Sequence, residues 1–226
     1  MSVTDTPLLS ADLPLLGADA AFDETELGKR ERNKLDKRRR IVAAATELFQ
    51  EKGFDDTTTA EIASAAGIGA GTLYLYVESK EDLLVSAFLN VAGGAWTEAF
   101  ERVDPEANVV DQVMALLLHV TKHHNADRRL ARSFFKELPF LSETGLAGAN
   151  TLVSWFLARL AQLFDVASAN GHLDPDVPKD RLALNIYAQW QLLMRRLVTD
   201  RFSYGQTAAE LDQCVRVALW GLTPKT

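Results

Sequence analysis

The chain has a single cysteine, Cys214, among its 226 residues. One cysteine cannot form an intrachain disulfide, so we expect a protein of the reducing cytoplasm. No apolar run approaches the roughly 20 residues that a membrane span needs, and no basic region precedes the leucines near the N-terminus. These absences exclude a disulfide-stapled secreted domain and argue against a signal peptide and a membrane partner.

The sequence also lacks the alternating pattern of strands, and it shows no internal repeat. Apolar residues instead recur at the spacing of amphipathic helices. At 47% hydrophobic content, the chain can bury one large core, or a small and a larger domain. We predict an all-α fold of about nine helices in two parts. Outside the DNA-binding motif described below, helical patterns cover 41–49, 80–102, 107–124, 127–138, 146–169, 179–202 and 207–221.

Charge is distributed unevenly along the chain. The net charge of −7 is unexpected for a nucleic-acid-binding protein, but residues 1–28 hold six acids and no base. Residues 29–40 hold eight bases against two acids, a local charge of +6. We interpret 1–28 as an acidic flexible tail and 29–40 as a basic arm directly before the first helix, suited to phosphate contact. A merely solvated, disordered run is the alternative.

Residues 58–84 have the spacing of a helix-turn-helix motif. Thr58 and Glu61 are placed as a capping box, which predicts the start of a helix, and Gly67 supplies the left-handed residue that ends it. Leu73, Tyr74 and Val77 recur at helical spacing in the next helix, and Ser79 caps the helix that follows. In such a pair the second helix enters the DNA major groove.

Four segments in fixed order carry a resemblance to a known family: RRRIVAAATELFQEKGF from Arg38, TTAEIASAAGI, GTLYLYV and SKEDLL. Together they resemble the tetracycline-repressor (TetR) family of bacterial transcription regulators, from Arg38 to about Phe88. The remaining chain matches only in being helical and of the expected length. The resemblance implies a three-helix DNA-binding domain at 29–84 and a helical effector-binding and dimerisation domain at 85–226.

The resemblance places Tyr74 and Lys80 at phosphates, and Thr72 and Tyr76 at the groove. Leu75 stands where the family often has polar or aromatic residues, so apolar contacts and DNA shape must supply more of the specificity. Three threonines at the start of the first motif helix have hydroxyls suited to a phosphate, or to capping alone. The full predicted DNA-binding set is Arg38, Arg39, Arg40, Thr57, Thr58, Thr59, Gly71, Thr72, Tyr74, Leu75, Tyr76 and Lys80.

The last two helical segments have wide apolar faces. Leu182, Ile186, Trp190, Leu193 and Leu197 form one stripe in 179–202, and Ala183, Tyr187 and Met194 widen it beyond the needs of a single core contact. In the resembled family, the corresponding helices pair with their symmetry mates. We therefore predict a homodimer through 179–202 and 207–221, with recognition helices roughly 34 Å apart on a palindromic double-stranded operator.

Aromatic residues are concentrated in the middle of the chain. Most must be ordinary core, but as a group they suit a cavity for a small, largely apolar effector. His119 and His123 stand four apart, yet no cysteine or carboxylate lies at ligand spacing, so we predict neither a metal nor a cofactor. The predicted effector residues are Trp96, Phe100, His119, His123, Phe134, Phe135, Trp155, Tyr187 and Trp190.

Two other functions stay open at this point. A helical enzyme would need a convergent nucleophile or metal constellation, and none is visible beyond the histidine pair. An architectural DNA-binding protein without a sensing function would differ by showing no ligand-induced release. We predict a cytoplasmic repressor that is not an enzyme and that a small ligand releases from DNA.

Overall fold

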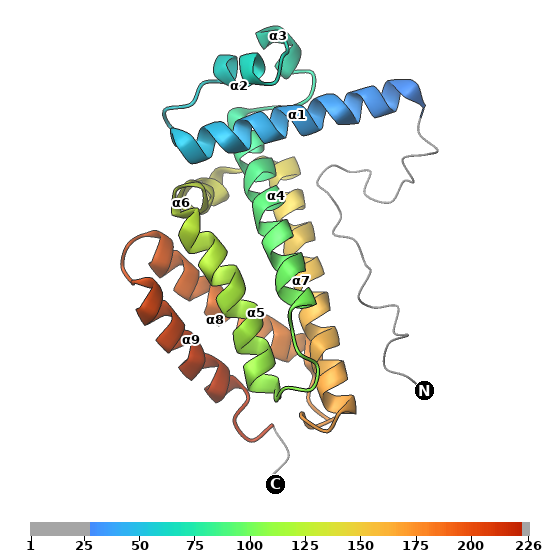
Figure 1. Ribbon diagram of the computed structural model, residues 1–226, viewed down its shortest axis with the longest axis vertical. Helices are drawn as coiled ribbons and strands as arrows, with labels where there is room; N and C mark the ends of the chain where they lie inside the picture. The colour runs from blue at the N-terminus through green and yellow to red at the C-terminus, as the bar shows by residue number, and fades with distance from the viewer. Residues whose placement is uncertain (1–27, 223–226) are drawn as a thin grey trace. The chain divides into compact units, whose positions relative to one another are not determined.

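The structure is a computed structural model that describes residues 28–222 (Figure 1). Within that range all regular structure is helical, with nine α-helices and one short 3-10 helix, which confirms the predicted fold class. The acidic tail, except for its last residue, lies outside the described residues. The chain divides into two compact units.

The N-terminal unit comprises described residues 28–91 and 127–152. The C-terminal unit comprises 92–126 and 153–222. The predicted domain limits at 84 and 85 stay predictions. The helices are α1 (Lys29–Glu51), α2 (Thr59–Ala65), α3 (Ala70–Leu73), α4 (Lys80–Glu101), α5 (Val109–Ala126), α6 (Arg128–Glu137), η3 (Leu138–Phe140), α7 (Glu143–Ala169), α8 (Lys179–Val198) and α9 (Tyr204–Ala218).

The basic segment 29–40 is not an arm before the first helix, as the sequence led us to expect, but the first half of α1. Lysine, arginine, glutamate and leucine all have high helix propensity, so residues 29–40 are helical and continuous with the amphipathic part of α1. Asp36 and Arg40 pair across one turn at 3.4 Å, which supports the helix further. The alternative of a disordered run is therefore wrong, and the basic side chains project from a regular helix.

Most helix ends differ by a few residues from the predicted limits, and α3 ends at Leu73, although the predicted second motif helix included Tyr74 and Val77. Two of the differences have a clear local cause. α9 begins at Tyr204 because Ser203 and Gln206 form a capping box. The predicted start at 207 was based on apolar periodicity alone and did not take this capping box into account. α8 ends at Val198 because the chain leaves the helix before Asp200, whose φ of 57° is left-handed.

The core of the N-terminal unit is built on the predicted stripe of α1. Ile41, Ala45 and Phe49 are fully buried, and Ile62 of α2 and Leu73 of α3 share that core. Each of the short helices α2 and α3 is therefore held in this core mainly by one large buried side chain, Ile62 or Leu73.

Helix α6 braces the end of α1 in the same unit. Arg129 donates to the Glu51 carbonyl at 2.7 Å, and Gln50 donates to the carboxylate of Asp127. Helix ends leave carbonyl groups without partners inside the helix, so the Arg129 guanidinium supplies a missing donor. α6 belongs to this unit although it lies far along the sequence.

The C-terminal unit buries the predicted stripe of α8. Trp190 is the largest fully buried residue there, and its indole N–H donates to the Thr121 hydroxyl at 3.0 Å. His124 lies beside the Trp190 ring, with ring centroids 5.9 Å apart. Burial, and secondarily the charge of His123, lowers the pKa of His124 to about 4, so this imidazole is neutral at physiological pH.

Two helices correct the sequence-based statement on apolar runs. α4, and α7 from Gly145 on, are long and apolar enough by composition to cross a membrane, because small residues between the apolar ones conceal these segments from a search for unbroken runs. Core helices share these properties, and 67% of the α4 window is buried within the protein, compared with 33% of the α7 window. The absence of a membrane partner stays a prediction.

Candidate DNA interface and effector core

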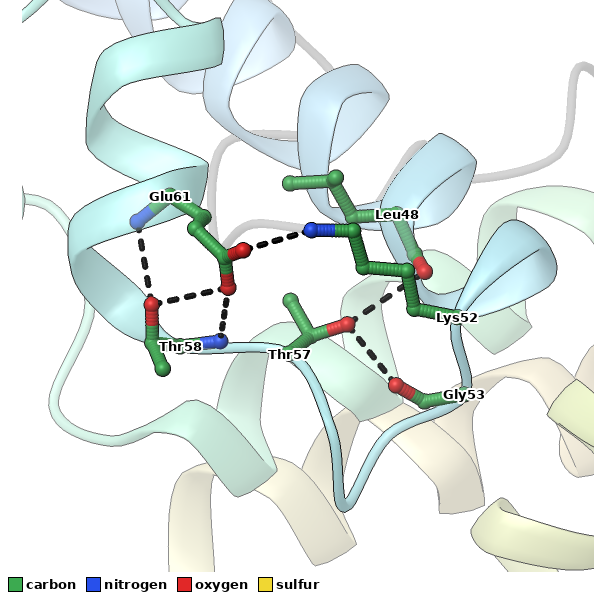
Figure 2. A network of polar contacts seen from close by, with 6 residues as sticks. All are labelled: Leu48, Lys52, Gly53, Thr57, Thr58 and Glu61. Carbon is green, nitrogen blue, oxygen red and sulfur yellow. Dashed lines mark hydrogen bonds and ion pairs between the residues drawn. The ribbon is translucent and has the colours of Figure 1, made fainter.

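A polar network fixes the start of α2 against the end of α1 (Figure 2). The Thr58 hydroxyl accepts from the Glu61 N–H at 3.2 Å, and the Glu61 carboxylate accepts from the Thr58 N–H at 2.8 Å. Lys52, one residue past the end of α1, donates to the other Glu61 oxygen at 2.5 Å. This confirms the predicted capping box and adds an ion pair between the two elements.

These contacts explain the acidity of Glu61. The hydrogen bond from Lys52 is the largest cause, and those from Thr58 add to it, lowering the pKa of Glu61 to about 2. The carboxylate is therefore charged throughout the physiological range.

Thr57 has a structural role and not the predicted phosphate contact. Only 1% of its surface is exposed. Its hydroxyl donates to the Gly53 carbonyl at 2.7 Å and lies 3.3 Å from the Leu48 carbonyl (Figure 2). A buried side chain that satisfies helix-end carbonyls has no surface to offer DNA.

The turn between the motif helices is as predicted. Gly67 has φ +68°, and Gly69 precedes α3 as its N-cap. After α3, Tyr74 and Leu75 are 57% and 75% exposed. The Tyr74 hydroxyl lies 3.2 Å from that of Thr59, so two predicted DNA-binding residues present neighbouring hydroxyls at the surface.

The start of α1 and the residues after α3 line one groove of about 640 Å³. Most of the residues that line it are basic. The others include Leu75 and Tyr76, which belong to the recognition segment, the predicted DNA-contacting residues 71–76. The repeat of bases along α1 puts them on one helical face. Only Tyr76 and Leu75 of this set were singled out individually from the sequence; the signal missed was helical spacing inside the basic segment. The groove is lined by Lys29, Arg30, Asn33, Lys34, Lys37, Leu75 and Tyr76.

The other predicted DNA-binding residues occupy the same unit. Lys80 places its ammonium 4.4 Å from the centre of the Phe54 ring, a cation–π contact that positions the charge. Arg39 and Arg40 are exposed, and Arg38 and Thr72 are half-buried. A Cβ added at Gly71 would meet open space, so packing within the chain does not require a glycine there.

Seven of the nine predicted effector residues lie in the C-terminal unit, where α4, α7 and α8 form an aromatic cluster. Trp96 lies 6.0 Å from Trp190, and Phe100 lies 5.8 Å from Trp155, measured between ring centroids. Phe156, which the predicted set lacks, is fully buried and stacks with Trp190. Phe134 and Phe135 belong to the N-terminal unit instead, where Phe134 stacks on Phe88 at 3.9 Å.

Several buried polar atoms line this aromatic region. The indole nitrogens of Trp96 and Trp155 and the amide oxygen of Gln191 make no hydrogen bond to any residue in the described part of the chain. Buried polar groups are hydrogen-bonded in more than about 90% of cases, so such a concentration marks a place where a bound molecule can supply partners. Burial also raises the pKa of Tyr187 to about 12, which keeps its hydroxyl neutral.

A buried cation belongs to the same cluster. Arg159 of α7 is 8% exposed, and its guanidinium lies 5.4 Å from the Phe100 ring centre and 6.0 Å from that of Trp155. Desolvation lowers the pKa of Arg159, and Glu101 opposes that shift. No local pattern in the sequence singles out this arginine, because only packing brings it to the aromatic rings.

The structure supplies the carboxylate that the sequence did not place near the histidine pair. Glu98 on α4 lies 3.4 Å from His119 Nε2 and 3.7 Å from His123 Nε2. One potential ligand atom from each of the three residues lies within 4.8 Å of the others. The spacing argument against a metal site was therefore incomplete, since Glu98 comes from the preceding helix.

The stripes on α8 and α9 do not form an exposed dimer face as predicted. Leu182, Tyr187 and Met194 are buried within the chain, which therefore uses them as its own core. The opposite faces carry other apolar residues. These are Leu184 and Leu192 on α8, and Val217 on α9 with Trp220 just beyond it, all exposed.

A family model described as bacterial regulatory proteins of the tetR family matches residues 41–87. The fatty acid metabolism regulator protein of Bacillus subtilis strain 168 is 35% identical over 83 residues, which are 37% of this chain and 41% of that protein. The transcriptional repressor KstR of Rhodococcus jostii is 25% identical over 192 residues, 81% of this chain and 83% of that one.

Among solved structures, FadR of Thermus thermophilus, a TetR-family transcriptional repressor in complex with lauroyl-CoA, aligns with a TM-score of 0.67. It is 25% identical and covers 84% of this chain and 96% of that one. The helix-turn-helix unit and these similarities define a DNA-binding transcription regulator. Residues 41–87 match the DNA-binding domain of the TetR family of bacterial regulators, and the chain as a whole is similar to members of that family.

The acidity of Glu61 predicts a pH-dependent stability. Because its folded-state pKa of about 2 lies below the ordinary 4.5, the carboxylate contributes stability that is full above about pH 4.5 and lost as the pH falls toward 2. Replacing Glu61 by Gln should lower stability at pH 7 and flatten the acid limb, measured by urea unfolding between pH 2 and 7. Glu47→Gln, at an exposed site on α1, is the control. An acid limb in the Glu61 variant as steep as in wild type would refute the assignment.

Proposed function

We propose that the protein is a cytoplasmic, homodimeric repressor that binds a palindromic operator and is released by an effector with an apolar chain and an anionic or carbonyl-bearing head. The carrying observation is the basic groove shared by α1 and the residues after α3, with Leu75 and Tyr76 at its edge. It combines phosphate-binding charge with the recognition segment.

In this proposal the basic face of α1 follows the phosphate backbone, while Tyr76 and the 75% exposed Leu75 reach the bases. An exposed leucine can contact a thymine methyl, and Thr72 adds a hydroxyl to the same segment. Lys80, Thr59 and Tyr74 bind the flanking phosphates. The open space at Gly71 lets the DNA backbone approach α3 closely.

We assign the dimer interface to the exposed faces of α8 and α9. Four of the large apolar side chains exposed in the described residues, Leu184, Leu192, Val217 and Trp220, occur on these two helices or directly after α9. Concentrated exposed apolar surface marks an interaction site, and α8 and α9 pack against each other within the chain. A second copy across a two-fold axis would bury this surface and place two recognition segments on one face of DNA.

We assign the effector site to the aromatic cluster of the C-terminal unit, and the effector class to acyl thioesters. The rings of Trp96, Phe100 and Trp190 suit an acyl chain, and the Trp155 indole N–H can donate to its carbonyl. Arg159 brings a positive charge to the same rings. The lauroyl-CoA complex of the Thermus regulator and the name of the Bacillus relative support this class.

Release from DNA requires that the effector bind better to a conformation with wrongly spaced recognition segments. Helix α4 is suited to this coupling because it is continuous from Lys80, at its first residue, to Trp96 and Phe100 near its end. A tilt of that helix would alter half-site spacing.

The DNA groove predicts weaker ionic binding on substitution. Lys34→Ala and Lys37→Ala should each weaken operator and non-specific binding and reduce the salt slope by about 0.9 for each phosphate that the variant no longer neutralises. Tyr76→Ala should weaken operator binding preferentially. Fluorescence anisotropy over a salt series measures both effects, with Lys122→Ala, an exposed lysine of α5, as the control. Unchanged slopes for both groove lysines would exclude this face of α1 from the interface.

The dimer assignment predicts dissociation by one surface charge. Leu192→Asp removes about 2 kcal/mol of apolar burial per chain and buries a carboxylate, so it should yield folded monomers with weak operator binding. Light scattering after size exclusion measures the mass, with Leu146→Asp, an exposed leucine of α7, as the control. A stable dimer of the Leu192 variant would place the interface elsewhere.

The effector assignment predicts that lauroyl-CoA stabilises the protein and lowers its operator affinity, whereas free CoA does neither. Trp155→Phe keeps the ring but removes the N–H donor, so it should weaken effector response by about 1 kcal/mol, roughly fivefold, with ligand-free operator binding intact. Thermal shift and operator competition measure the response, and Trp220→Phe is the exposed control. Stabilisation by lauroyl-CoA without any change in DNA binding would refute the switch.

A further inference from the structure

We propose that Glu98, His119 and His123 form a binding site for a divalent transition metal of the zinc type. Two histidine nitrogens and one carboxylate oxygen are an established ligand set for zinc, with a position left open for water or another ligand. The proposal concerns the C-terminal unit alone and does not depend on the proposed effector.

The backbone already places the three ligands. His119 and His123 are one turn apart on the same face of α5, with ring centroids 4.7 Å apart. Glu98 Oε2 lies 3.4 Å and 3.7 Å from their Nε2 atoms. Metal–ligand bonds of about 2.0 Å in a tetrahedron put ligand atoms roughly 3.3 Å apart, so small side-chain rotations close the site.

The surroundings of the ligand atoms also suit a metal. His119 Nε2 is buried and makes no hydrogen bond to the chain within residues 28–222. A hydrogen-bond acceptor nitrogen that is buried beside a carboxylate is costly unless a cation or proton joins the two. His123 is 42% exposed in its side chain, so a metal can enter from solvent.

Arg102 orients the Glu98 carboxylate. Its guanidinium lies 2.5 Å from Glu98 Oε1, one turn along α4, and leaves Oε2 directed at the histidines. Contacts of this kind, to a group that itself binds the metal, hold metal-binding carboxylates in place. Desolvation acts to raise the pKa of Glu98, but the Arg102 guanidinium paired with this carboxylate contributes to a net lowering of the pKa.

The site joins two helices. Glu98 is on α4, and the histidines are on α5. A bound metal therefore crosslinks α4 to α5 and stabilises the folded state, because the unfolded chain does not hold the three ligands together.

The test uses the full chain without an affinity tag, freed of metal with a chelator and titrated with zinc chloride and, separately, cobalt chloride. We expect calorimetry to show one zinc bound per chain and the melting temperature to rise. The cobalt-bound protein should show visible absorption bands typical of a cobalt ion with four or five ligands. Glu98→Gln, His119→Gln and His123→Gln should each weaken zinc binding at least roughly tenfold, since changes to groups that only orient a ligand already cost that much. Circular dichroism checks that each variant is folded.

His172→Gln, Glu101→Gln and Cys214→Ser are the matched controls, at a histidine, a glutamate and the cysteine outside the cluster. They should bind zinc as wild type does. The proposal is overturned if the wild-type chain shows no saturable zinc binding, or if the cluster variants bind as tightly as the controls. His123→Gln decides the matter if either of the other variants fails to fold, because this side chain is largely at the surface.

Discussion

The last turn of α1 is the point on which the N-terminal unit depends. A helix end exposes carbonyl groups that need donors, and here two different elements supply them. The Thr57 hydroxyl, from the segment that leads into α2, lies 3.3 Å from the Leu48 carbonyl in that turn, and Arg129 of α6 donates to the carbonyl of Glu51. Lys52 then ties the α2 capping box to the same turn. The helix-turn-helix and α6 are therefore both held by one helix end.

This arrangement explains why a helix from the second half of the sequence belongs to the DNA-reading unit. Phe134 of α6 stacks on Phe88 of α4 while Arg129 holds α1. Close-packed aromatic rings do not deform smoothly, so a tilt of the first half of α4 must repack Phe134 or carry α6 with it. Either response acts on the end of α1, where α2 is anchored. Helix α6 thus links movement of α4 to the orientation of the motif.

Local signals predicted local structure well. The start of α2 followed from Thr58 and Glu61, and the turn followed from Gly67, because caps and left-handed glycines act within a few residues. The same logic at Ser203 and Gln206 would have fixed the start of α9, had the capping signal been weighed with the periodicity. By contrast, Glu98 and Arg159 acquire their neighbours only when separate helices pack, and the sequence of one helix contains no information on that neighbourhood.

Apolar periodicity predicted which helix faces are buried but not whether they are buried within the chain or against a second copy. The α8 stripe was correctly identified as apolar, yet its width reflects contacts within the chain, and residues such as Leu192 on the other face remain exposed. Periodicity counts apolar positions on a helix and does not distinguish an internal neighbour from a second copy. In the proposed dimer, a two-fold axis at the exposed faces of α8 and α9 would bring two basic grooves, each beside a Leu75, to the same DNA. Association would then convert a weak, salt-sensitive contact of one chain into selective recognition of two half-sites.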